Sequence, residues 1–130
     1  MATWDDVRRI ALALPGTHEE PSGDGWLAWR VKKKLFAWER PLRRADLEAL
    51  GATAPDGPIL AAHVPDLGAK EALLADDPEV YFTTPHFNGY PAILVRLERI
   101  DEPELNELLL EAWARQAPKR LSKEFLNSAS

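Results

Sequence analysis

The spacing of apolar residues changes several times along this chain, and the order of these spacings constrains its fold more than any other feature. From residue 4 to residue 14, apolar residues recur every three or four positions, which predicts an amphipathic helix. Thr3 and Asp6 form a capping-box pattern at its start, and Pro15-Gly16 ends it. Residues 18–25 are polar and contain Pro21 and two glycines, which predicts a loop.

Alternation with a period of two follows this loop and predicts a β-hairpin. Its strands are expected at residues 26–31 and 34–38, joined by a turn at Lys32-Lys33. Three later apolar runs, each bounded by prolines or polar residues, also have the character of strands. They lie at residues 59–64, 80–83 and 92–98.

Three helical segments are predicted in the second half of the chain. Asp66 is the expected N-cap of a short helix over residues 67–75, and Asp101 begins the longest helix of the chain. After Pro118, Leu121 and Phe125 predict one more short helical piece, beyond which the last few residues are expected to be disordered. Residues 39–58 are the least regular part and contain only an isolated helical segment at 45–50.

This order of elements defines a fold class. Helix, hairpin, strand, helix, strands and helix form neither a regular βαβ alternation nor an all-β pattern. We therefore expect one α+β domain over residues 1–130, with helices packed on one face of a largely antiparallel sheet. The positions expected to be almost fully buried are Val7, Leu14, Leu35, Ile93, Val95, Leu105, Leu109 and Trp113.

The composition excludes several classes of protein. The chain has no cysteine, which excludes disulfides, thiolate nucleophiles and cysteine-ligated zinc. Its N-terminus is acidic, unlike a signal peptide, and no apolar run approaches the roughly 20 residues of a membrane span. We expect a cytoplasmic protein with no membrane partner that exists as a monomer or a weak oligomer.

Charge is distributed unevenly along the chain. The net charge is −5, but residues 30–44 contain seven basic residues and one acid, so that segment is +6 and the remainder is −11. One interpretation is contact with nucleic-acid phosphates, which gives affinity without sequence information. The other is a solvated turn whose lysines protect a sheet edge from aggregation. The seven basic residues are Arg30, Lys32, Lys33, Lys34, Arg40, Arg43 and Arg44.

The remaining candidate residues do not form a recognisable catalytic group. Each histidine stands alone, without a second one at a metal-binding spacing, and no glycine-rich phosphate loop follows a strand. We therefore expect no metal, no cofactor and no enzymatic activity. Trp26 and Trp38 are open between core packing and a pocket, and His63, His86 and Tyr90 are candidates for a ligand or partner surface.

Several short motifs occur in a characteristic order. They are Ile10 to Gly16 at the end of the first helix, Glu19-Glu20, Trp29-Arg30-Val31, Lys34 to Ala37, Tyr81-Phe82 and Leu108-Leu109. In this order they resemble the MmcQ/YjbR family over most of the chain. The resemblance implies a frataxin-like (CyaY-like) α+β fold and DNA binding through a surface called a double wing. Two segments depart from the family pattern. Residues 40–58 are longer and richer in proline, and residues 83–87 lack the lysines frequent there.

Two functional hypotheses follow. The first is a weak, non-specific DNA-binding module that uses the basic hairpin. The second is a protein-interaction or small-ligand-binding module on the side of His63, His86 and Tyr90, with no role in nucleic-acid binding. A contiguous positive surface over residues 32–44 would favour the first hypothesis, whereas a scattered arrangement of these residues would favour the second.

Overall fold

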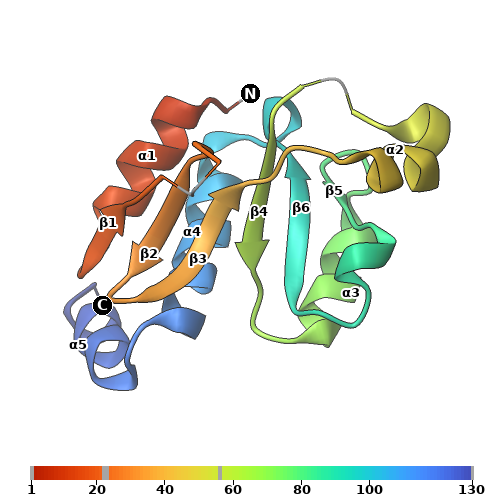
Figure 1. Ribbon diagram of the computed structural model, residues 1–130. Helices are drawn as coiled ribbons and strands as arrows, with labels where there is room; N and C mark the ends of the chain where they lie inside the picture. The colour runs from red at the N-terminus through yellow and green to blue at the C-terminus, as the bar shows by residue number, and fades with distance from the viewer. Residues whose placement is uncertain (1, 22–23, 56, 130) are drawn as a thin grey trace.

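The computed structural model describes residues 2–21, 24–55 and 57–129, and these contain a six-stranded sheet and five α-helices (Figure 1). The helices are α1 (Trp4–Leu12), α2 (Arg44–Leu50), α3 (Leu67–Asp76), α4 (Glu102–Gln116) and α5 (Lys119–Ala129). The strands are β1 (Thr17–Glu19), β2 (Ala28–Val31), β3 (Lys34–Glu39), β4 (Ile59–His63), β5 (Tyr81–Phe82) and β6 (Ala92–Arg96). Short 3-10 helices lie at η1 (Gly51–Thr53), η2 (Pro85–Phe87) and η3 (Leu97–Arg99). None of the described helices is both long and apolar enough to cross a lipid bilayer.

The sheet has the order β1-β2-β3-β4-β6-β5, and every neighbouring pair is antiparallel. This confirms the α+β prediction. The β2–β3 hairpin turns at Lys32-Lys33 as expected, with Val31 opposite Lys34. β4 and β6 pair along their whole lengths, from Ile59 opposite Arg96 to His63 opposite Ala92.

Local signals placed the helix starts correctly. In α1, Asp6 donates its backbone N–H to Thr3 Oγ1 at 3.3 Å, and Thr3 donates its own to Asp6 Oδ2 at 2.9 Å, which completes the capping box. Asp66 caps α3 and Asp101 caps α4 by accepting backbone N–H groups at 2.8 and 2.9 Å. These bonds join residues three positions apart, so the sequence pattern was sufficient to predict them.

The loop predicted over residues 18–25 is wrong at its start, because Thr17–Glu19 form strand β1. Thr17 lies opposite Val31 and Glu19 lies opposite Trp29, at one edge of the sheet. The Glu19 carboxylate accepts bonds from the Trp29 indole at 3.0 Å and from Arg8 at 2.7 Å. Backbone pairing and polar contacts hold this edge strand in place. Its residues therefore lack the alternation of apolar and polar side chains from which a strand is predicted.

The main core lies between one face of the sheet and α1, α3, α4 and α5. In Figure 1, α4 lies behind β3. The buried side chains of α4 pack against this face of the sheet. All the predicted core positions are buried except Leu35, for which the prediction is wrong. Leu35 is half-buried on the opposite face, and Phe36 and Ala37 face the main core instead. The β2–β3 pairing is irregular at this point, because Trp29 lies opposite Ala37 whereas Arg30 lies opposite Leu35. Phe36 is left without a partner in this bulge, so two successive residues face the core and a strict period of two places Leu35 on the wrong face.

A second, smaller cluster lies on the outer face of the sheet. It covers β4, β5 and β6 beneath η2 and α2, and it ends at Trp38 on β3. Its buried members are Ile59, Ala61, Phe82, Phe87, Ala92 and Leu94. The outer face over β2 and β3 lies beyond this cluster, and that part of the sheet carries the site described below.

The last helix of the chain, α5, extends to Ala129. Disorder was expected over the last few residues, of which Ser130 lies outside the described part. The Phe125 ring packs edge-on against Trp113 with 5.2 Å between ring centroids, and Leu121 also contacts the main core. Burial of these two apolar side chains holds the helix in place.

Candidate functional site

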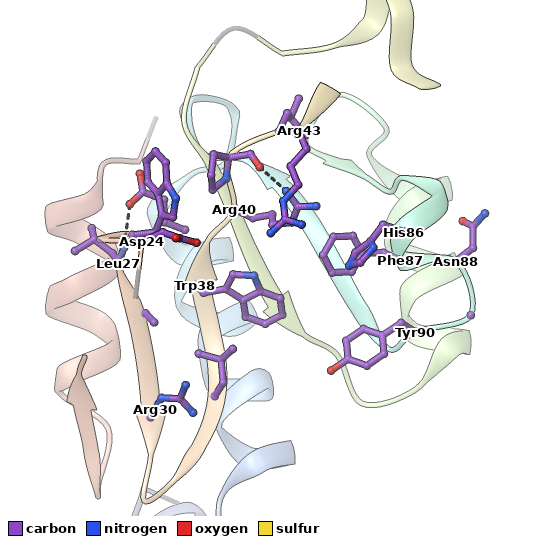
Figure 2. Close-up of a pocket in the computed structure, with 17 residues that line it drawn as sticks. Asp24, Leu27, Arg30, Trp38, Arg40, Arg43, His86, Phe87, Asn88 and Tyr90 are labelled. Atoms are coloured by element: carbon purple, nitrogen blue, oxygen red, sulfur yellow. Dashed lines mark hydrogen bonds between the residues drawn. The ribbon is translucent and has the colours of Figure 1, made fainter. Parts of the chain in front are cut away.

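A pocket of about 970 Å³ opens on the outer face of the sheet, beside the β2–β3 hairpin. Three parts of the chain line it. They are residues between 24 and 30, residues between 35 and 43, and the loop 86–90. Trp38 on β3 lies at its centre, with Tyr90, Phe87 and His86 on one side and Asp24 and Leu27 on the other (Figure 2).

Aromatic side chains form most of the apolar surface near Trp38. The Trp38 ring lies 6.4 Å from the Phe87 ring, and Phe87 in turn lies 6.3 Å from Tyr90, measured between centroids. Trp26 and Tyr90 at the rim remain 42% and 45% exposed. Large exposed aromatic groups around a concave surface are typical of a site that binds another molecule.

A buried lysine holds the loop that forms one wall of the pocket. Lys70 on α3 is only 5% exposed, and its ammonium donates to the carbonyl oxygens of Phe87 at 2.5 Å and Tyr90 at 2.9 Å. Burial lowers the pKa of Lys70. This role was not predicted from the sequence, because a lysine on a short helix normally faces water. Lys70 therefore anchors the wall rather than contacting a ligand.

Arg40 and Asp46 anchor the part of the pocket wall next to this loop. Arg40 is 7% exposed and donates to Asp46 Oδ2 at 3.1 Å and to the Pro41 carbonyl, and its guanidinium lies 5.4 Å from the centre of the Phe87 ring. Burial opposes ionisation of Asp46, but the Arg43 backbone N–H and the Arg40 charge outweigh it and hold the pKa of Asp46 below its ordinary value. This pair joins β3, α2 and η2.

The seven basic residues proposed from the sequence do not form one contiguous surface. Lys32, Lys33 and Lys34 are exposed at the hairpin turn, whereas α2 lies at the far end of β3 (Figure 1). Arg44 on α2 is paired with Glu48 at 3.3 Å. The other three, Arg30, Arg40 and Arg43, line the pocket, and Arg40 is buried there.

The second proposed surface meets the same pocket. His86 and Tyr90 line it, whereas His63 is buried beside it, with its ring 5.5 Å from Trp38 and 5.6 Å from Tyr90. Burial lowers the pKa of His63, and the positive charge of Arg115 lowers it further. Two residue sets that the sequence suggested as alternatives thus contribute to one site.

Within residues 2–21, 24–55 and 57–129, no three His, Asp or Glu side chains gather where they could hold a metal ion. The polar groups of the pocket are instead arginines, His86, Asn88 and two acids, Asp24 and Glu39, set among aromatic rings. This arrangement is suited to binding an organic molecule by stacking and hydrogen bonds.

The fold and the pocket together define an α+β domain with an aromatic site on the outer face of its sheet. The chain belongs to the YjbR family, whose sequence model matches residues 12–115, and this confirms the resemblance stated above. It is 57% identical over 129 residues to uncharacterised proteins of Mycobacterium bovis and of two Mycobacterium tuberculosis strains, with 97% of both chains covered. A crystal structure of a Deinococcus radiodurans protein with a DUF419 domain shares the fold. Its TM-score is 0.66 at 24% identity, and the match covers 95% of this chain and 88% of that one.

Proposed function

We propose that this protein is a small-ligand-binding module and that the Trp38 pocket is its binding site. The observation that carries the proposal is the aromatic pocket on the part of the sheet where the outer-face cluster ends. Its volume of about 970 Å³ lies at the upper end of the range of roughly 300–1,000 Å³ typical of ligand sites. The mixture of aromatic rings with a few charged groups is also typical of such sites.

The pocket is held in shape by contacts that do not depend on a ligand. Lys70 fixes the loop of Phe87 and Tyr90, and the Arg40–Asp46 pair fixes the start of α2. Trp38 itself is on a strand paired on both sides. A preformed site loses little conformational freedom on binding, which favours affinity for a small molecule.

A ligand screen monitored by NMR tests this proposal. In uniformly ¹⁵N-labelled protein, compounds that raise the melting temperature should shift the indole N–H signal of Trp38. The indole signals of Trp29 and Trp113 serve as internal controls, because these N–H groups donate to Glu19 and to the Pro15 carbonyl inside the fold. In Trp38→Leu, which has no such signal, the same compounds should no longer raise the melting temperature. Stabilising compounds that leave the Trp38 signal unmoved, or a chemically diverse library without any binder, would refute the proposal.

Weak, non-specific DNA binding is the second candidate function, and the exposed lysines of the hairpin turn favour it. Lys32 and Leu121 of α5 would both contact a Cβ atom placed on Gly16, so α5 lies next to this turn. α5 adds exposed basic side chains at Lys119, Arg120 and Lys123, of which Arg120 is paired with Glu124. A local patch can act despite a negative net charge, because screening limits charge effects to about 8 Å at physiological salt.

A salt series of binding to duplex DNA tests the second candidate. With some three to five phosphate contacts, log affinity should fall with log salt at a slope of about −3 to −4. Lys32→Ala/Lys33→Ala/Lys34→Ala should weaken binding to all sequences and flatten the slope. The control variant Arg44→Ala/Arg99→Ala changes two arginines at the other end of the sheet, and it should leave the DNA affinity and the salt slope unchanged. Absence of binding at ~50 mM salt would eliminate this candidate.

A further inference from the structure

The Trp38 pocket is positive within a negatively charged protein. Its lining contains three arginines and two acids, a formal charge of +1, whereas the whole chain carries −5. The charges are also separated. Figure 2 places Asp24 on one side of Trp38, and Arg40, Arg43 and His86 on the other. One end of the pocket is therefore suited to a negative group.

Two of the three arginines already have partners in the fold. Arg40 is paired with Asp46, and Arg30 donates to the Lys33 carbonyl at 3.2 Å and lies 3.7 Å from Glu20. On the acidic side, Glu39 accepts the Leu27 backbone N–H at 3.0 Å. Side chains whose hydrogen bonds are already made within the fold shape the pocket wall and contribute less to recognition of a ligand.

Arg43 differs from the other two arginines. Its side chain is exposed and lines the pocket, and no acidic side chain in the described part of the chain lies within 4.0 Å of its guanidinium. Its backbone is nevertheless fixed, because its N–H donates to Asp46 Oδ2 at 2.9 Å. An anchored arginine with available N–H donors matches the planar geometry of a carboxylate or a phosphate, which it can bind through two bonds.

The surface next to Arg43 is suited to an aromatic ring. Trp38 lies between the charged ends of the pocket, and Phe87 and Tyr90 continue the apolar surface from it toward His86 (Figure 2). Indole and phenyl faces bind planar rings by offset or edge-on stacking. A ring over Trp38 would place an attached acidic group on the Arg43 side.

We infer that the ligand of this pocket is a planar aromatic anion, with its ring against Trp38 and its carboxylate or phosphate at Arg43 and His86. The inference rests on the proposed ligand-binding function and specifies the chemistry of the ligand. Arg43 determines specificity in this arrangement, because it favours the charged group, whereas Trp38 binds the ring whatever its charge.

Matched probes separate the charge of the ligand from its ring. Indole-3-acetate, indole-3-ethanol and tryptamine share one ring and carry a negative, no and a positive charge. AMP and adenosine form the corresponding phosphate pair. In NMR titrations that follow the Trp38 indole N–H, the anion of at least one pair should bind at least about tenfold tighter than its neutral counterpart, a difference typical of a charge-assisted pair. The pair with the larger ratio identifies carboxylate or phosphate as the group recognised.

Two neighbouring arginines provide a variant and its control. Arg43→Gln should remove most of the tenfold preference and leave indole-3-ethanol binding unchanged. Arg44→Gln should have no effect, because Arg44 is absent from the pocket lining and pairs with Glu48. Raising the salt concentration should reduce anion binding in the wild type and much less in Arg43→Gln.

Three results would overturn the inference. They are equal binding of anionic and neutral probes, an Arg43→Gln protein that keeps the full preference, and failure of every probe to shift Trp38. In the third case the library screen decides the proposed function separately. Library compounds that shift Trp38 would leave the pocket as a ligand site of another specificity, whereas a library without binders would refute the proposed function as well.

Discussion

Arg40 and Asp46 form an ion pair whose side chains are only 9% and 5% exposed, with 3.1 Å between Nη2 and Oδ2. Water contributes little to either charge at this depth, so each depends on the other and on nearby backbone groups. Asp46 accepts from the Arg43 N–H as well as from Arg40, and Arg40 also donates to the Pro41 carbonyl. At the scale of the residue, the pair locks one wall of the pocket in place.

Asp46→Asn should therefore lower the free energy of unfolding at pH 7 by about 3–5 kcal/mol, because it leaves the Arg40 charge buried and unpaired. Urea unfolding measures this loss. Glu48→Gln, which removes the partner of the exposed Arg44, should cost less than about 0.5 kcal/mol. Equal stability of Asp46→Asn and wild type would mean that Arg40 is not buried in the folded protein.

The same variant tests the pH dependence of stability. The folded-state pKa of Asp46 lies below the ordinary value of about 3.9. The wild type therefore retains the contribution of the pair above that value and loses it as the pH falls through the folded-state pKa. Asp46→Asn should lack this component, so its stability should fall less steeply on acidification below about pH 4.

At the scale of the element, the loop from Pro85 to Tyr90 depends on α3, a helix far from it in sequence. Lys70 reaches the Phe87 and Tyr90 carbonyls across 17 and 20 residues of chain. A neutral lysine keeps two N–H donors, so loss of its proton does not by itself remove either bond. The two hydrogen bonds of Lys70 therefore depend on its N–H donors and their geometry more than on its charge.

Lys70→Met keeps most of the length of the side chain and removes its donors. We expect a loss of about 1–3 kcal/mol, because two carbonyls lose their buried donor, and faster hydrogen exchange at Tyr90. The Tyr90 N–H bonds to the Phe87 carbonyl at 3.1 Å, so it reports on this loop directly. Glu71→Gln, on the exposed side of α3, is the control. Unchanged exchange in Lys70→Met would show that the loop is held by its own packing alone.

The β2–β3 turn offers a test in which two neighbouring substitutions should have opposite signs. Lys32 has a φ of 56°, and it is the one non-glycine residue with a positive φ in the described chain. Lys32→Gly should raise stability by about 0.5 kcal/mol, because relief of backbone strain exceeds the added freedom of the unfolded chain. Lys33→Gly gains no such relief and should lower stability by about 0.4–1 kcal/mol. Thermal unfolding of both variants measures the difference in their stabilities. An increase in stability in Lys33→Gly would contradict the turn geometry.

At the scale of the whole molecule, the two ends of the chain stabilise the same part of the fold. Gly16 has a φ of 72°, and a Cβ atom there would lie 3.1 Å from Leu121 Cδ2 and 3.3 Å from Lys32 Cε. Glycine is thus needed at this position both for its backbone conformation and for the close approach of α5. α5 in turn packs Phe125 against Trp113, whose indole donates to the Pro15 carbonyl at 2.9 Å.

Phe125→Ala should lower the free energy of unfolding by about 1–2 kcal/mol, because the half-buried ring contributes both apolar burial and an edge-on contact with Trp113. Leu126→Ala, at the next position, should cost less than about 0.5 kcal/mol, since Leu126 is largely exposed. Chemical unfolding of both variants provides the comparison. Equal effects would mean that α5 does not pack on the core through Phe125.

The sequence by itself determined the features whose contacts are local. The caps of α1, α3 and α4 join residues three positions apart, and the stripe from Leu105 to Trp113 follows from the helical period alone. Neighbouring residues carry the whole signal in these cases, so their pattern predicts the structure. The order of elements and the family motifs were sufficient for the α+β class and the YjbR family.

Only the tertiary structure decided which surfaces meet. It turned Leu35 toward the outer face, buried Arg40 against Asp46, and brought Arg43 to the same pocket as His86. These outcomes depend on partners far apart in the chain, and a period of two or of 3.6 contains no information about such partners. The basic segment is continuous in sequence, but strand β3 separates the hairpin turn from the start of α2 by its whole length, so its basic residues do not gather on one surface.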